Sequence, residues 1–176
     1  MPRFNGGLVG YFGYETIKYI EPKLKKNEKE DPIGSPDILL MVSDEVIIFD
    51  NLSGKLFIIV HAEPEKNNAY SDAKKRLNTI SEILSSNQVK KTQLNISRDV
   101  NEKDFVSGFT QENYEKAVDT IKKYIVNGDA MQVVLSQRLS IPFESKPINL
   151  YRALRSLNPS PYMYFLDLGD FQIVGS

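Results

Sequence analysis

Cysteine is absent from this chain of 176 residues, which excludes disulfide bonds and catalysis by a thiolate. Histidine is scarce as well. His61 stands alone, without the second histidine or the cysteine that a metal cage needs, so a structural role is favoured over a chemical one. Neither sign of charge prevails, because the formal net charge is −1, and such a balance creates no field that would recruit nucleic acid or an anionic membrane.

Long hydrophobic runs are also missing. No apolar stretch approaches the ~20 residues of a membrane span, and the start lacks the charged-then-apolar pattern of a signal peptide. We therefore expect a cytoplasmic protein with no membrane and no nucleic-acid partner. What is present, 41% hydrophobic and 26% charged residues, is typical of a globular protein. The chain stops within the strand-like run FQIVGS, so we expect a piece of a longer polypeptide.

The N-terminal part has the pattern of a sheet with one helix. Two β-branched runs, Ile38–Asp50 and Leu56–Ala62, flank a connector that contains Asn and Gly, which predicts a hairpin. A helix is expected from Pro64 onward, and its apolar face packs on the sheet. The polar stretch 85–104 shows little periodicity and predicts a linker, so we divide the chain into domains 1–104 and 105–176.

The second part centres on Gly128–Arg138, which we predict to be a strand after a helix that Thr110 caps and Asn127-Gly128 ends. Alternation divides this strand into two faces. The core face would hold Met131, Val133, Leu135, Gln137 and Leu139, and the other face Gln132, Val134, Ser136 and Arg138. The second face is either an ordinary solvated sheet face or one wall of a site for a small anionic ligand.

The last predicted helix, Ile148–Leu157, ends at the sequence Asn158-Pro159-Ser160-Pro161. The two prolines hold the chain extended as it enters a strand at Tyr162–Leu168, which turns at Gly169-Asp170 into Phe171–Val174. The rigid segment that leads into Tyr162 and Met163 could be a loop clamp or one wall of a pocket for an aromatic ligand.

Together these motifs resemble component I of anthranilate synthase, the chorismate-binding subunit that opens tryptophan biosynthesis. The resemblance is carried in order by GGLVGYFGYE, by PDILL with SDEVIIFD, by ENYEKAV with GDAMQVVLSQR, and by LYRALRSLNPSPYMYFLDLGDFQIVGS. It implies an α+β fold of mixed, mainly antiparallel sheet layers with packed helices. It also implies that 1–104 is the C-terminal part of the family's N-terminal domain plus a linker, and that 105–176 begins the chorismate-binding domain.

The family's reaction uses ammonia, delivered by a glutaminase partner in a hetero-oligomer, to convert chorismate to anthranilate and pyruvate. The resemblance implies that Mg²⁺ holds the ring carboxylate of chorismate through glutamates that lie outside this chain, so no metal ligand is expected here and the chain alone should be inactive. It also implies that L-tryptophan inhibits, with Pro161, Tyr162 and Met163 forming half of its site. Asn158, Pro159 and Ser160 would shape that half.

Gln132 is the candidate catalytic residue of this chain. The resemblance implies that it lines the chorismate site, where its side chain cannot act as a base. Relatives that add water to chorismate place a lysine there as general base, so glutamine favours ammonia as the nucleophile. Three alternatives stay open. Gln132 could merely satisfy hydrogen bonds of the sheet. The protein could be the large subunit of aminodeoxychorismate synthase, although Tyr162-Met163 favours the tryptophan pathway, or a non-catalytic chain that binds an effector or a partner.

Overall fold

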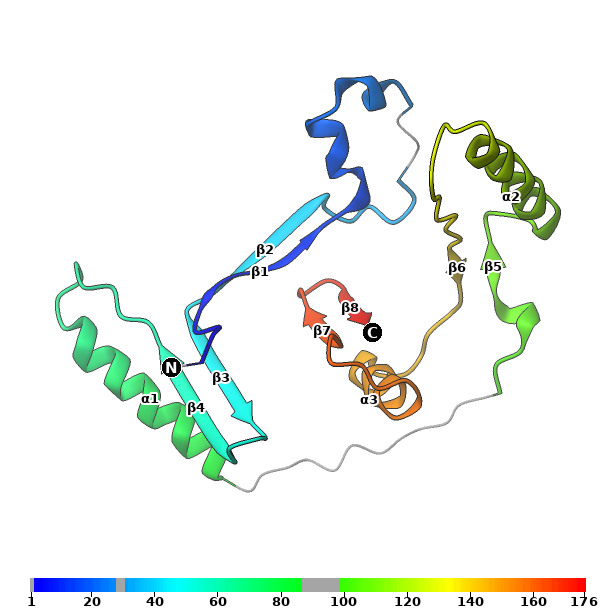
Figure 1. The fold of residues 1–176 in the computed structure, drawn as a ribbon. Coiled ribbons are helices and arrows are strands. Elements are labelled where there is room, and N and C mark those ends of the chain that lie inside the picture. The colour runs from blue at the N-terminus through cyan, green and yellow to red at the C-terminus, as the bar shows by residue number, and fades with distance from the viewer. Residues whose placement is uncertain (1, 28–30, 87–98) are drawn as a thin grey trace. The chain divides into compact units, whose positions relative to one another are not determined.

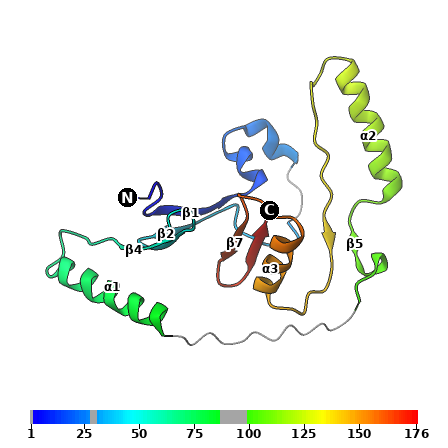
Figure 2. The same ribbon diagram turned by 60° about the horizontal axis from the view of Figure 1, so that its bottom comes forward.

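The computed structural model describes residues 2–27, 31–86 and 99–176. The chain forms two compact units, Met1–Lys91 and Thr92–Ser176, which are described separately (Figures 1 and 2). The division of the chain at residues 104 and 105 stays a prediction. None of the helices in the described parts of the chain is long and apolar enough to cross a membrane.

The first unit is built on two antiparallel pairs of strands (Figure 1). Strand β1 (Gly7–Phe12) pairs with β2 (Ile38–Ser43), and β3 (Glu45–Asp50) pairs with β4 (Lys55–Val60). The β3–β4 hairpin confirms the prediction from the Asn and Gly connector. At its turn the Asp50 carboxylate accepts hydrogen bonds from the backbone N–H groups of Leu52 and Ser53, at 3.1 and 3.0 Å.

Helix α1 (Ala69–Ser85) packs on β4, as expected from its apolar stripe. Ile80 is its buried residue, with 7% of its surface exposed, and Arg76 makes a two-pronged ion pair with Glu45 at 2.6 and 2.8 Å. The helix begins at Ala69 and not at Pro64, because the residue before it, Asn68, adopts a left-handed conformation with φ +64° that no helix continues.

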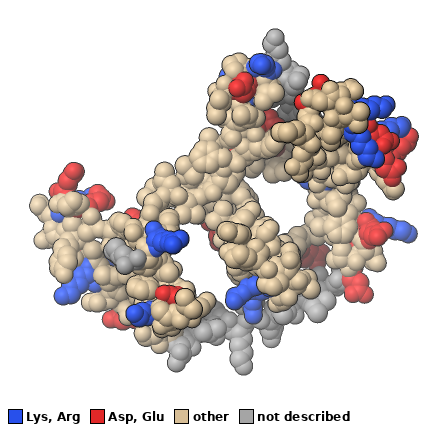
Figure 3. Space-filling view, in the orientation of Figure 1, with Lys and Arg blue, Asp and Glu red and all other residues tan. Residues whose placement is uncertain are grey.

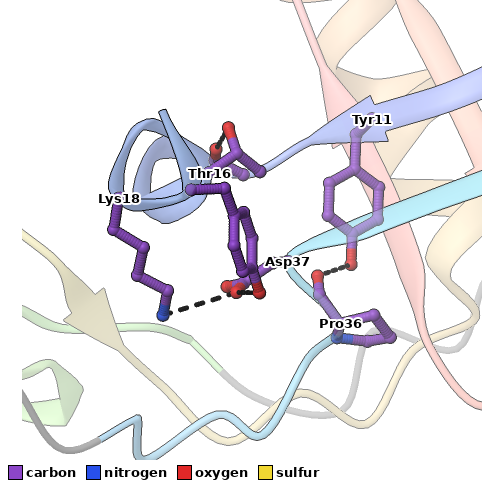
Figure 4. A network of polar contacts seen from close by, with 7 residues as sticks. Tyr11, Thr16, Lys18, Pro36 and Asp37 are labelled. Carbon is purple, nitrogen blue, oxygen red and sulfur yellow. Dashed lines mark hydrogen bonds and ion pairs between the residues drawn. The ribbon is translucent and has the colours of Figure 1, made fainter. Parts of the chain in front are cut away.

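Two short 3₁₀ helices, η1 (Tyr14–Tyr19) and η2 (Pro22–Asn27), follow β1. Figure 4 shows how polar contacts join this region to the start of β2. The Tyr19 hydroxyl donates to the Asp37 carboxylate at 2.6 Å, the Lys18 ammonium lies 3.4 Å from it, and the Tyr11 hydroxyl donates to the Pro36 carbonyl at 2.7 Å. The hydrogen bond from Tyr19, and then Lys18, hold the pKa of Asp37 below its usual value.

The second unit contains α2 (Gln111–Val126), α3 (Pro147–Leu157) and two strand pairs. Strand β5 (Val106–Ser107) pairs with β6 (Leu139–Ser140), and β7 (Tyr164–Asp167) pairs with β8 (Gln172–Gly175); a 3₁₀ turn, η3 (Glu102–Asp104), precedes them. The β7–β8 hairpin packs on α3, where the rings of Tyr151 and Phe165 lie 6.1 Å apart. The predicted turn at Gly169-Asp170 is confirmed, and Gly169 has φ +88°.

The predicted strand Gly128–Arg138 is wrong. After α2 the chain is extended, but within the described residues pairing with another strand begins only at Leu139–Ser140, beyond the predicted strand. The predicted core face is also wrong, since Met131 is 98% exposed and only Leu135 of its five members is even half-buried. The physical reason is that alternation can order the two faces of an extended segment, but a strand also needs a neighbour for its backbone hydrogen bonds.

The α+β architecture is confirmed: helices pack beside antiparallel strand pairs, each of two strands among the described residues. The β7–β8 pair has open edges among the described residues, and Tyr162, just before it, is 83% exposed. In Figure 3 charged side chains gather over α2, while the surface along β1 and β2 is largely uncharged. Such two-stranded pairs have little core of their own.

Candidate functional site

The segment 158–163 joins α3 to β7 and forms a tight, locally bonded turn. The Asn158 N–H donates to the Leu154 carbonyl at 2.8 Å and ends the helix, because Pro159 has no N–H with which to continue it. Ser160 then organises the turn: its hydroxyl oxygen accepts from the Tyr162 N–H at 3.2 Å, and its carbonyl accepts from the Met163 N–H at 3.5 Å. The geometry fits the shaping role expected of Asn158, Pro159 and Ser160, which stays a prediction.

The turn presents its three predicted effector-binding residues unevenly. Pro161 and Tyr162 are exposed, and Met163 is half-buried. An exposed aromatic ring beside a thioether offers apolar surface with a polar hydroxyl tip, which suits an aromatic ligand. The described residues do not close a pocket over these side chains, so the turn is at most one wall of a site.

The base of this turn is held by the last strand. The Ser176 hydroxyl donates to the Asn158 carbonyl at 3.3 Å, which ties the end of β8 to the end of α3. Tyr164 is paired with Gly175 across the hairpin, and its ring lies where a side chain at Gly175 would have to be. These contacts fix the direction in which the chain leaves Met163.

Gln132 lies on the extended segment 131–138, exposed and without a hydrogen-bond partner among the described residues. The described structure therefore gives no support to the alternative that its amide satisfies a sheet ladder. Nor does it join Gln132 to the segment 158–163 through a hydrogen bond or a ring contact between described residues. The predicted chorismate-lining residue and the predicted half of the effector site are thus separate features, and the role of each stays a prediction.

Sequence reasoning did not predict the hydrogen bonds that Gln137 makes near the Gln132 segment. Gln137 was placed on the core face, but its amide donates to the Ser107 hydroxyl at 2.8 Å and to the Phe109 carbonyl at 3.2 Å. The only sequence signal was an amide on a face that is otherwise apolar. Such an amide needs a partner, yet alternation does not say which one.

The described residues do not hold a metal site, since they contain no group of three or more His, Asp or Glu side chains that could ligate an ion. His61 uses its ring Nε2 in a contact of 2.6 Å with the Asn5 carbonyl, which supports the structural interpretation. His61 also lines an open groove of about 260 Å³ beside α1, where Arg76 and Glu45 pair. The hydrogen bond between these two side chains lowers the pKa of Glu45 and raises the pKa of Arg76.

The match to known proteins identifies the class of protein. Residues 2–176 match the family model described as chorismate binding enzyme, and the chain belongs to that family. The relatives narrow the class further. Component 1 of anthranilate synthase from Pseudomonas putida is 51% identical over 177 residues, and that from Pseudomonas aeruginosa is 52% identical; each alignment covers 100% of this chain and 36% of the relative. The chain thus spans little more than a third of the length of these curated relatives.

A solved structure agrees with this kinship. Anthranilate synthase component I from Streptococcus pneumoniae TIGR4 matches with a TM-score of 0.77 and 34% identity, over 98% of this chain and 38% of that one. The resemblance inferred from the motifs is therefore confirmed, and so is the fold class.

Proposed function

We propose that this chain is part of component I of an anthranilate synthase, a lyase that opens tryptophan biosynthesis. The observation that carries the proposal is the 51% and 52% identity to proteins of that name along the whole chain. A cytoplasmic location belongs to the same proposal.

The reaction balances as chorismate plus ammonia giving anthranilate, pyruvate and water. Ammonia forms the new C–N bond at C2 while the C4 hydroxyl leaves as water. The enolpyruvyl C–O bond then breaks and the ring proton at C2 is lost, which makes the ring aromatic. A proton added to the methylene carbon of the leaving group completes pyruvate. A glutaminase subunit would supply the ammonia from glutamine. Mg²⁺, when bound, would hold the ring carboxylate of chorismate, and its ligands would be glutamates outside this chain.

Gln132 would line the chorismate site as a polar group that is not a base. Ammonia is already a nucleophile, so this reaction needs no general base of the kind that activates water, and a neutral amide can instead orient a polar group by hydrogen bonding. Its exposure and its free hydrogen-bonding capacity within the described chain support this role.

Pro161, Tyr162 and Met163 would form half of a site for L-tryptophan, the inhibitor. Support comes from the exposed aromatic and thioether surface and from the turn that Ser160 and the end of β8 hold in place. The described residues leave both this half-site and Gln132 open to solvent. We therefore expect the chain alone to be inactive.

The test uses the polypeptide encoded by the whole reading frame that contains these residues, incubated with chorismate, Mg²⁺ and ammonium. Anthranilate is followed by its fluorescence and pyruvate by a coupled lactate dehydrogenase assay. We expect both products in equal amounts, and with glutamine we expect them only when a glutaminase subunit is added. The isolated chain of 176 residues, assayed in parallel, should give neither.

The outcomes separate the alternatives. An amino product that keeps its enolpyruvyl group, without pyruvate, would identify an aminodeoxychorismate synthase. Tryptophan or glutaminase binding without any turnover by the whole polypeptide would identify a non-catalytic protein. Anthranilate from the isolated chain would overturn the proposal that essential groups lie elsewhere.

A further inference from the structure

The segment 131–138 is held at both of its ends and by no strand partner in between, within the described part of the chain. At its start, the backbone N–H groups of Gly128 and Asp129 donate to the Ile125 and Tyr124 carbonyls, at 3.1 and 2.9 Å, so the chain turns sharply off α2. At its end, β6 forms only two residue pairs with β5. Figures 1 and 2 show the segment running back along α2 between these two points.

The lengths of the two elements match. A helix of 16 residues is about 24 Å long at ~1.5 Å per residue, and the eight residues 131–138 span about 26 Å when extended at ~3.3 Å per residue. An extended segment of this length can therefore return along the whole of α2.

One side chain adds to the anchor at the end of the segment. Gln137 uses its Nε2 to donate to the Ser107 hydroxyl at 2.8 Å and to the Phe109 carbonyl at 3.2 Å. Ser107 is itself fixed, because its hydroxyl donates to the Phe109 carbonyl at 2.9 Å and accepts from the Phe109 N–H at 3.0 Å.

That acceptor turn is in turn fixed to the start of α2. The Phe109 ring packs edge-on against Tyr114, with centroids 5.6 Å apart, and Thr110 caps the helix by accepting from the Asn113 N–H at 3.3 Å. The Gln137 amide thus joins the returning segment to a rigid point at the base of the helix. We call Gln137, Ser107 and Phe109 the amide clamp.

The spacing along the segment relates the clamp to the face on which Gln132 lies. Gln132 and Gln137 are an odd number of residues apart, so in an extended chain they lie on opposite faces. A slip of one residue would exchange the faces of the whole segment, and the two pairs of β5 and β6 are a weak barrier to such a slip. We propose that Gln137 is a positioning residue, which through Ser107 and Phe109 sets the register that presents Gln132 to chorismate.

This proposal rests on the proposed function and is tested by anthranilate formation in the whole polypeptide, with chorismate, Mg²⁺ and ammonium. The variant is Gln137→Met, which keeps the length of the side chain and removes its donors. The matched control is Gln111→Met, since Gln111 is an exposed glutamine of α2 that donates only to Glu115. We expect Gln137→Met to lower kcat about ten- to a hundredfold, with little change in KM for chorismate, and Gln111→Met to leave kcat unchanged.

The decisive measurement is the same change in a Gln132→Ala background. If Gln137 acts through Gln132, then Gln137→Met should lower kcat of that variant by less than about twofold, because there is no longer a side chain to position. A purely structural role predicts the same loss in both backgrounds. If Gln137→Met fails to fold, Ser107→Ala, which removes one acceptor of the clamp, is taken through the same cycle.

The results separate the two proposals. An unmodified polypeptide that makes no anthranilate overturns the proposed function and this inference with it. An active polypeptide whose kcat is unaffected by Gln137→Met, or is lowered equally in both backgrounds, overturns the inference alone. So does an active polypeptide in which Gln132→Ala has no effect.

Discussion

The pairing of β1 with β2 depends on the absence of a side chain at Gly10. Gly10 faces Leu40 across the pair, and a methyl group built on it would overlap the carbonyl oxygen of Leu39 and lie 2.9 Å from the Cα of Leu40. These are backbone atoms, which cannot rotate away as a side chain can. Gly10→Ala must therefore force the two strands apart at the middle of the pair.

The cost follows from the ladder. The pair runs from Gly7 opposite Ser43 to Phe12 opposite Ile38, so opening its centre breaks two or more backbone hydrogen bonds. At about 1 kcal/mol for each bond, with further loss from side-chain packing, we expect a cost of about 2–4 kcal/mol. Alanine recovers about 0.4–1 kcal/mol by restricting the unfolded chain. The net loss in free energy of local unfolding is then about 1–3.6 kcal/mol, with a central value near 2 kcal/mol.

Hydrogen exchange of the whole polypeptide, read by mass spectrometry on peptides from β1 and β2, measures this loss where it occurs. A loss of about 2 kcal/mol corresponds to roughly thirtyfold faster exchange through local opening. The control is Gly108→Ala, because a methyl group at Gly108 meets nothing within 4 Å. It should leave exchange in β1 and β2 unchanged. Equal exchange of these peptides in Gly10→Ala and the unmodified protein would refute the steric argument.

Three further substitutions probe other contacts. Asp37→Asn should flatten the acid dependence of stability: the lowered pKa of Asp37 stabilises the fold above its unfolded pKa of about 3.9, and this is lost as pH falls through the folded pKa, so urea unfolding at pH 3 and pH 7 should differ less. Thr110→Ala should cost about 1 kcal/mol in urea unfolding by loss of the α2 cap, whereas Thr120→Ala, within the same helix, should cost almost nothing. Gly175→Ala should cost only about 0.5–1.5 kcal/mol in urea unfolding, because the ring of Tyr164 can swing aside, and a change in its near-ultraviolet circular dichroism should accompany this.

Sequence reasoning succeeded where the signals are local. The α2 helix was predicted from its Thr110 cap to its stop at Asn127-Gly128, and the structure has it at Gln111–Val126 with Gly128 at φ +83°. The same holds for the β3–β4 and β7–β8 hairpins, whose turns are written in a few adjacent residues. In each of these cases a short stretch of sequence contains every group that the backbone needs.

It failed where the partner is distant. Alternation along Gly128–Arg138 predicted a strand, but no local rule says whether a neighbouring strand is there to bond it. Gln137 was read as a core residue for the same reason, because its partners, Ser107 and Phe109, come 30 and 28 residues earlier. The start of α1 was misplaced because the left-handed Asn68 carries no unambiguous sequence signal.

The two proposed sites combine both kinds of contact. The turn 158–163 is held by a local hydrogen bond to Ser160 and by a longer-range one from Ser176, at the end of β8. The segment that bears Gln132 is joined by the amide clamp to residues that are distant in sequence. Neither is closed over by the described residues. Under the proposed function, these supports would orient Gln132 and the residues 161–163, and the remaining walls of both sites would come from groups that the described residues do not supply.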